Sequence, residues 1–251
     1  MIIEFRVLGG PTVAVDGVDC SPTAPKVRQV MALLLANANQ VVQAETIMME
    51  LWGETRPTSA TTTTQTYVYH LRKLFAHQGI EGPHGEALTT RGKGYVLDID
   101  PQCLDEHNFR ELVQRAQTHF YEGRYREASG FVGQAMCIWQ GLPYCDVEQG
   151  YLLEAHAVNL EELYTRAVEL RIESNMGLGR HREMIGELRT LVAQKPLNEW
   201  LHGRLIEALG RAGRRSEALD AYQTMRQVLD CELGLNPSEE SRRLQAEVLN
   251  A

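Results

Sequence analysis

The sequence of 251 residues lacks the long apolar runs and the signal peptide that mark membrane and exported proteins. No stretch approaches the roughly 18 consecutive apolar residues of a membrane span. The first ten residues, MIIEFRVLGG, lack the basic head and apolar segment of a secretory signal. These absences predict a cytoplasmic protein with no membrane partner.

Cysteine is scarce, and no cysteine or histidine pattern indicates a metal site. The five cysteines are an odd number without a C-x-x-C pair, and the eight histidines are scattered without ligand-like spacing. Such a pattern suits reduced, mostly packed thiols better than disulfides or zinc ligands. We therefore expect no metal and no cofactor. The cysteines are Cys20, Cys103, Cys137, Cys145 and Cys231.

Motifs of catalysis are missing as well. Neither G-x-S-x-G nor H-E-x-x-H occurs. The segment RGKG at 91–94 matches a phosphate-binding loop only in part, because Ala87 stands where that motif needs glycine and Gly94 where it needs serine or threonine. The sequence therefore predicts that the protein is not an enzyme.

The chain as a whole is acidic, but one segment of it is basic. The net charge is −8, yet residues 56–97 hold five cations against only Glu81 and Glu86. Distribution matters more than the sum for binding nucleic acid. The basic segment contains the unusual stretch SATTTTQTYVYHLRK at 59–73, in which four threonines stand in a row despite their low helix propensity.

The first 100 residues have the pattern of a small sheet followed by three helices and a hairpin. Residues 2–20 alternate short apolar runs with an Asp-Gly turn, which predicts antiparallel strands. From Lys26 onward, apolar residues recur at helical spacing. The same spacing returns around residues 44–52, and again after a cap at Thr58 or Ser59. A loop, HQGIEGPHGE, precedes ALTTRGKGYVLDI, a strand, a basic turn and a strand. This order is that of a winged helix-turn-helix.

This layout offers an explanation for the four consecutive threonines. If Val68, Leu71 and Phe75 form the buried stripe of the third helix, the outward face carries short hydroxyls, an amide and cations that can meet phosphates and base edges. The alternative is that residues 58–64 only cap the helix and cover its surface. The outward residues are Thr62, Thr63, Thr66 and Tyr69, with Gln65 and Arg72 beside them, and Arg91 and Lys93 lie at the hairpin tip.

Beyond Pro101 the composition is almost entirely helical. GRYREA, GRHREM and GRRSEA repeat one helix-ending pattern, and the last two begin 34 residues apart, at 179 and 213. This period predicts tetratricopeptide-like repeats, with an extended connection near residue 140 and a long helix over about 151–176; an unrelated helical bundle is the alternative. We predict a mainly α protein with a small N-terminal β component, divided into domains 1–100 and 101–251.

The chain resembles a known family over essentially its whole length. APKVRQVMALLLANANQVV, the segment from IMMELWG to HLRKLF, TTRGKGYVL, and EALDAYQTMRQVLDCELGLNPSEESRRLQ are similar to the Streptomyces antibiotic regulatory proteins. The resemblance implies an OmpR-type winged helix joined to a bacterial transcriptional activator domain. It also implies an activator that binds direct repeats near promoters of antibiotic gene clusters.

Partners and contact residues follow from the same resemblance. It implies a homodimer side by side on double-stranded DNA, contacts to RNA polymerase subunits including a sigma factor, and association with the nucleoid. Matching the family's motifs position by position gives the expected DNA contacts Thr62, Thr63, Gln65, Thr66, Tyr69 and Arg72 on the recognition helix, Lys73 at its far end, Arg91 and Lys93 in the wing, and Lys26 and Arg28 at the first helix.

One alternative of another class stays open at this point. A tetratricopeptide-like scaffold or ligand sensor could keep the same architecture while its N-terminal domain no longer binds DNA. Absence of DNA binding, or binding with little salt dependence, would favour it.

Overall fold

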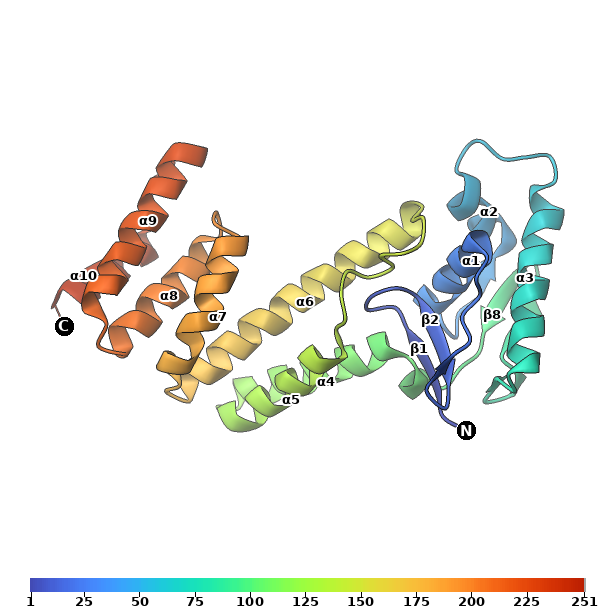
Figure 1. Ribbon diagram of the computed structural model, residues 1–251, viewed down its shortest axis with the longest axis horizontal. Coiled ribbons are helices and arrows are strands. Elements are labelled where there is room, and N and C mark those ends of the chain that lie inside the picture. Colours follow the sequence, from blue (N-terminus) through green and yellow to red (C-terminus); the bar gives the residue numbers. More distant parts are fainter. Residues whose placement is uncertain (251) are drawn as a thin grey trace. The chain divides into compact units, whose positions relative to one another are not determined.

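The chain opens with a three-stranded antiparallel sheet. The computed structural model describes residues 1–250 of the chain (Figure 1). Strands β1 (Ile3–Arg6), β2 (Thr12–Val15) and β3 (Val18–Asp19) lie in that order in the sheet. Asp16 and Gly17, between β2 and β3, have φ angles of 48° and 80°. Positive φ at both central residues is what the predicted Asp-Gly hairpin turn requires.

Three helices follow and share one core. They are α1 (Pro25–Ala36), α2 (Ala44–Trp52) and α3 (Ala60–His77), and α1 and α2 both pack against α3. Val68, Leu71 and Phe75 are at most 3% exposed, which confirms the predicted stripe. Burial of this stripe fixes which face of α3 remains outside.

The wing is a second sheet of three strands. Strands β4 (Val42–Gln43), β8 (Gly94–Leu97) and β7 (Leu88–Arg91) lie in the order β4-β8-β7, and Arg91 pairs with Gly94. Gly92 and Lys93 therefore form the tip. A Cβ atom added to Gly94 would lie 2.4 Å from the Val42 carbonyl oxygen, so only glycine fits where β8 meets β4.

Two short features differ from the sequence prediction. The segment expected to be a loop contains a hairpin, β5 (Glu81–Gly82) with β6 (Gly85–Glu86), and the two-residue strand β4 was not expected either. Strands of two residues show no alternation of polar and apolar side chains, so the pattern on which strand prediction depends is absent.

The remainder of the described chain is helical. A 3₁₀ turn, η1 (Pro101–Cys103), precedes the long helices. Gly123, Gly179 and Gly213 stand between successive helices with φ between 72° and 78°, the left-handed conformation that ends helices. The helices are α4 (Asp105–Tyr121), α5 (Tyr125–Ile138), α6 (Tyr151–Gly177), α7 (His181–Gln194), α8 (Glu199–Arg211), α9 (Arg215–Leu233) and α10 (Glu239–Asn250). The predicted long helix and extended connection are confirmed.

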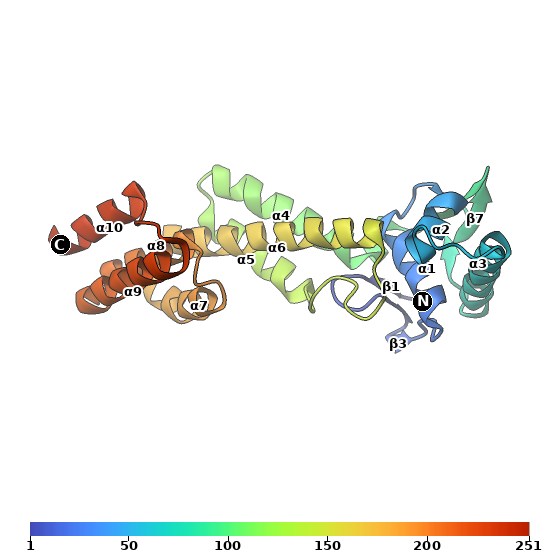
Figure 2. The same cartoon turned by 90° about the horizontal axis from the view of Figure 1, so that it is seen from above.

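Two compact units make up the chain. The first consists of Met1–Thr118 and Gly130–Glu169, and the second of His119–Ser129 and the chain from Leu170 onward. In the second unit α7 packs on α8, and α9 and α10 pack on α8 and on each other (Figures 1 and 2). The tetratricopeptide-like classification and the domain limits 1–100 and 101–251 stay predictions.

The cysteines correct one expectation. All five are free, as predicted. Cys137, Cys145 and Cys231 are exposed, however, so the prediction of mostly packed thiols is wrong for these three. Each lies on the outward side of its helix or loop, which cysteine spacing alone cannot indicate. No helix within residues 1–250 is both long enough and apolar enough to span a membrane.

Candidate nucleic-acid interface

The outward side of α3 presents small polar side chains. Thr62, Gln65, Thr66 and Tyr69 are exposed and Thr63 is half-buried. We call these five residues the recognition face. The Thr66 hydroxyl donates to the Thr62 carbonyl oxygen at 2.9 Å, so this threonine satisfies its donor within the helix and keeps its oxygen as an acceptor. The face therefore offers acceptors, donors and methyl groups to a partner.

Thr64 lies on the opposite side. Its side chain is 1% exposed, and its hydroxyl has no hydrogen-bond partner within the described residues. A buried hydroxyl without a partner lowers stability. The run of four threonines therefore divides between surface and core, and Thr64 faces the interior of the domain.

The start of α3 is capped by its backbone only. Ser59 precedes the helix, as predicted, but its side chain makes no cap hydrogen bond. Its carbonyl oxygen accepts from the Thr63 N–H at 2.9 Å. N–H groups in the first turn of a helix form a site for anions such as phosphate.

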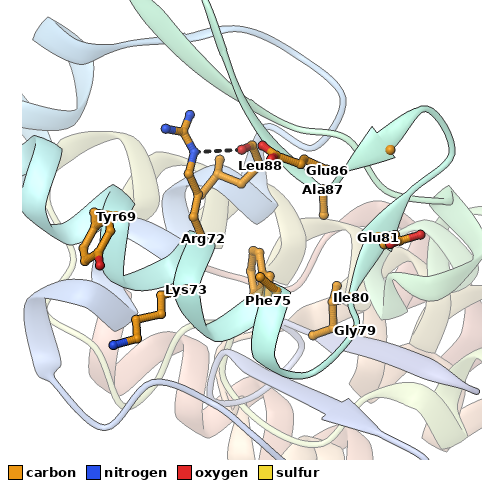
Figure 3. A pocket seen from close by; sticks show the side chains of 12 residues that line it. Tyr69, Arg72, Lys73, Phe75, Gly79, Ile80, Glu81, Glu86, Ala87 and Leu88 are labelled. Atoms are coloured by element: carbon orange, nitrogen blue, oxygen red, sulfur yellow. Dashed lines mark hydrogen bonds between the residues drawn. The ribbon is translucent and has the colours of Figure 1, made fainter.

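Arg72 braces the recognition helix against the wing (Figure 3). Its Nε donates to the Leu88 carbonyl oxygen at 2.9 Å, and a terminal nitrogen donates to the Thr90 hydroxyl at 2.7 Å. The guanidinium carbon also lies 5.8 Å from the centre of the Tyr95 ring. A guanidinium has five N–H donors. Arg72 therefore fixes α3 relative to β7 and still has donors for a phosphate.

A pocket of about 550 Å³ lies below this brace, between α3 and the β5–β6 hairpin. Its floor is apolar and includes Phe75, Ile80 and Ala87. In Figure 3 the charged ends of Arg72 and Lys73 point away from this floor. A ligand site needs converging polar groups, so the cavity does not have the geometry of one. Lys73 is exposed at the far end of the recognition face.

The wing tip carries two exposed cations, Arg91 and Lys93. Neither has an ion-pair partner among residues 1–250. The Lys93 carbonyl oxygen accepts from the Ala44 N–H at 3.0 Å, which ties the tip to the start of α2. The tip is therefore held in place while its charges stay available.

Lys26 and Arg28 have partners within the first unit. The Lys26 ammonium lies 2.7 Å from a Glu148 carboxylate oxygen, and the Arg28 guanidinium lies 2.6 Å from Asp146. Both acids belong to the connector, which we define as residues 139–150. The hydrogen bond and the charge of Lys26 lower the pKa of the Glu148 carboxyl. These expected phosphate contacts are thus engaged inside the chain.

Glu50 was missed by the sequence analysis. This α2 side chain is 4% exposed, and its carboxylate accepts from the N–H groups of Gly150, Leu152 and Leu153 at 2.8 Å, 2.8 Å and 3.2 Å. It therefore caps the start of α6. The available signal was a charge on the apolar face of a helix, three residues after the buried Ile47.

Asp105 makes a second missed junction. Its carboxylate accepts from the N–H groups of Val7 at 2.9 Å and Leu8 at 3.0 Å, just beyond β1. Burial raises the pKa of Asp105 to about 6, although these hydrogen bonds oppose the shift. Glu50 and Asp105 together join the winged helix to the helices that follow it.

No group of three or more histidine, cysteine, aspartate or glutamate side chains within the described residues could hold a metal ion. The side chains gathered at α3 and the wing tip are hydroxyls, an amide and cations. Their chemistry suits binding to a polyanion with readable edges.

Both halves of the chain match known families of transcriptional regulators. Residues 21–97 match the family described as "Transcriptional regulatory protein, C terminal", and residues 104–249 match the bacterial transcriptional activator domain. Among similar proteins, the regulatory protein DnrI of Streptomyces peucetius is 37% identical over 99% of this chain and 93% of its own length. The transcriptional regulator RedD of Streptomyces coelicolor is 31% identical over 98% of this chain and 70% of its own.

A solved structure is similar over nearly the same extent. Mycobacterium tuberculosis EmbR, determined in complex with a low affinity phosphopeptide, superposes with a TM-score of 0.90 at 29% identity. The alignment covers 99% of this chain and 65% of that one. These relatives are transcriptional regulators, which confirms that the chain is not an enzyme. The chain belongs to the Streptomyces antibiotic regulatory protein family of transcriptional regulators.

Proposed function

We propose that the protein is a sequence-specific, DNA-binding transcriptional activator. It binds direct repeats at promoters of a secondary-metabolite gene cluster and recruits RNA polymerase. The observation that carries this proposal is the largely exposed recognition face of α3, flanked by Arg91 and Lys93, which have no ion-pair partner within residues 1–250. Residues 1–100 bind DNA, and residues 101–251 supply the protein contacts.

Specificity comes from α3 in the major groove. Each good pairing between a side chain and a base edge is worth about 1 to 3 kcal/mol. Gln65 has the amide that pairs with adenine, and the threonine methyl groups can contact the methyl group of thymine. Lys73, Arg91 and Lys93 add attraction to phosphates, which falls as salt rises.

Affinity requires two copies. A single winged helix with few available cations binds weakly, and the internal pairs of Lys26 and Arg28 reduce the number further. Two copies on adjacent direct repeats raise the effective concentration of each other. Binding in the same orientation places their centres about 34 to 36 Å apart, one turn of DNA.

The test is footprinting of the purified protein on promoter fragments from its neighbouring genes, repeated at several salt concentrations. The proposal predicts protection of spaced direct repeats and a steep loss of affinity with salt. If the folded protein protects no sequence and binds DNA without salt dependence, the interaction scaffold becomes the better assignment.

A further inference from the structure

An acidic segment of the chain lies just after α5. Residues 139–169 contain six acids and a single cation, Arg166. Asp146 and Glu148 are paired with Arg28 and Lys26. The next three acids, Glu154, Glu161 and Glu162, are exposed on α6 and have no ion-pair partner within the part of the chain that the structure describes.

Apolar side chains lie among these acids. Tyr151 is 77% exposed and Val158 is 56% exposed, and Ala155 between them is exposed too. Helix positions separated by three, four and seven residues share one face. We therefore define the α6 stripe as Tyr151, Glu154, Ala155, Val158, Glu161 and Glu162, about 16 Å long at the rise of an α-helix.

The stripe is not needed for the core of its own unit. Leu153, Ala157 and Leu160 form a separate, buried face of α6, at most 5% exposed. An outward helix face is normally polar. A large exposed aromatic ring and an exposed valine between acids suit a surface that another protein covers.

The first unit holds the stripe in place. Glu50 caps the N-terminus of α6, and the Trp139 ring lies 4.5 Å from that of Tyr164, further along the helix. Trp139 also lies 5.2 Å from Phe109 of α4. A preformed surface loses less conformational freedom when a partner binds.

We propose that the α6 stripe is the docking surface for a basic, amphipathic helix of the RNA polymerase holoenzyme. Lysine or arginine side chains of that helix face the three glutamates, and its apolar side chains cover Tyr151 and Val158. This inference rests on the recruitment of polymerase stated above and assigns it to one helix face.

Charge disfavours two other occupants. DNA is excluded because the stripe carries the same sign as phosphate. Two copies meeting through the same stripe would place like charges together, which opposes association. Lys73, Arg91 and Lys93 of the winged helix are assigned to DNA, and Lys26 and Arg28 are paired within the chain, so these cations are not available to a neighbouring copy.

The experiment compares two triple variants of the full chain. One is Glu154→Gln with Glu161→Gln and Glu162→Gln. The matched control, Glu183→Gln with Glu232→Gln and Glu247→Gln, changes the same number of exposed glutamates outside the stripe and shifts the net charge equally. A third variant, Tyr151→Ser with Val158→Ser, tests the apolar part.

Each protein is bound to its footprinted promoter, and purified RNA polymerase holoenzyme from Streptomyces coelicolor is titrated onto the complex. The stripe variant is expected to bind polymerase about tenfold more weakly, with a flatter salt dependence, and the serine variant at least fivefold more weakly. The control stays within twofold of wild type. All variants keep their promoter affinity within twofold and their thermal midpoint.

The outcomes separate this inference from the function on which it rests. If wild type binds polymerase and the stripe variant does so equally well, or the control loses as much, the stripe is not the docking surface although recruitment stands. If promoter-bound wild type fails to bind polymerase, recruitment and the inference fail together. Lost cooperativity on the direct repeats would instead assign the stripe to a second copy.

Discussion

The two basic regions of the winged helix differ in what their charges touch. At α3 and the wing, Lys73, Arg91 and Lys93 are exposed and have no ion-pair partner within residues 1–250. At α1, Lys26 and Arg28 are each paired with an acid of the connector. A cation can stand at a DNA-contact position of the family and still be paired with an acid of its own chain. Only a cation without such a partner is free to bind a phosphate of DNA.

The side of the winged helix with the paired cations, at α1, is also where it is attached to the helices that follow. Glu50 and Asp105 accept backbone N–H groups about 100 residues away in the sequence. On the side of α3 and the wing, the recognition face makes only local side-chain hydrogen bonds, such as Thr66 with Thr62, and the longer-range hydrogen bonds of Arg72 reach no further than β7. Substitutions on the first side should therefore change stability, and those on the second should change DNA binding.

The largest effect is expected at Glu50. Glu50→Ala leaves three backbone N–H groups at the start of α6 without their acceptor and should lower the free energy of unfolding by about 3 kcal/mol. Glu50→Gln keeps one oxygen acceptor and should lose about half as much. Urea denaturation measures both. A loss below about 0.5 kcal/mol for the alanine variant would show that this contact does not hold the two parts together.

Asp105 should make the attachment depend on pH. Its folded-state pKa of about 6 lies above the ordinary value of 3.8, so the folded protein keeps a proton that the unfolded chain has lost. This contribution to stability is full below about pH 4 and is lost as the pH rises through about 6, a change of about 3 kcal/mol.

Urea denaturation of wild type and Asp105→Asn at several pH values isolates this effect. Burial raises the pKa of Glu106, but its bonds to His156 and Arg110 lower it below its ordinary value, so Glu106 acts in the opposite direction. Since Glu106 is present in both proteins, the difference between them reports Asp105. A difference that does not change between pH 4 and pH 7 would contradict the assignment.

Thr64→Val should sharpen the distinction between the two sides of α3. Removing a buried hydroxyl without a partner, at nearly constant shape, should raise the free energy of unfolding by about 1 kcal/mol. Promoter affinity should stay within about twofold, because Thr64 is not on the recognition face. A loss of specific binding with stability unchanged would instead give Thr64 a role in DNA recognition.

The smallest effect separates the two basic regions directly. Lys93→Ala should weaken binding to all sequences alike and reduce the slope of log affinity against log salt by about one unit. Lys26→Ala should reduce that slope by clearly less, because its charge is already paired with Glu148. Equal slope changes would mean that the Lys26 pair opens on DNA. Gel-shift titrations at four salt concentrations provide the comparison.

Local pattern accounts for what the sequence predicted correctly. The Asp16-Gly17 turn, the stripe of α3 and the glycines that end α4, α6 and α8 depend on residues within one or two turns of chain. The engaged acids could not be found in this way. Glu50, Asp105, Asp146 and Glu148 act through partners far away in the sequence. The hydrogen bonds of Arg72 likewise depend on how β7 packs against α3. The periodicity of a helix in the sequence gives no information about that packing.

The most direct test of the account is the affinity of wild type and Gln65→Ala for the footprinted direct repeat and for a random duplex at one salt concentration. The account predicts a loss of about 1 to 3 kcal/mol on the repeat and almost none on the random duplex. An equal loss on both sequences would contradict the claim that the exposed face of α3 reads bases.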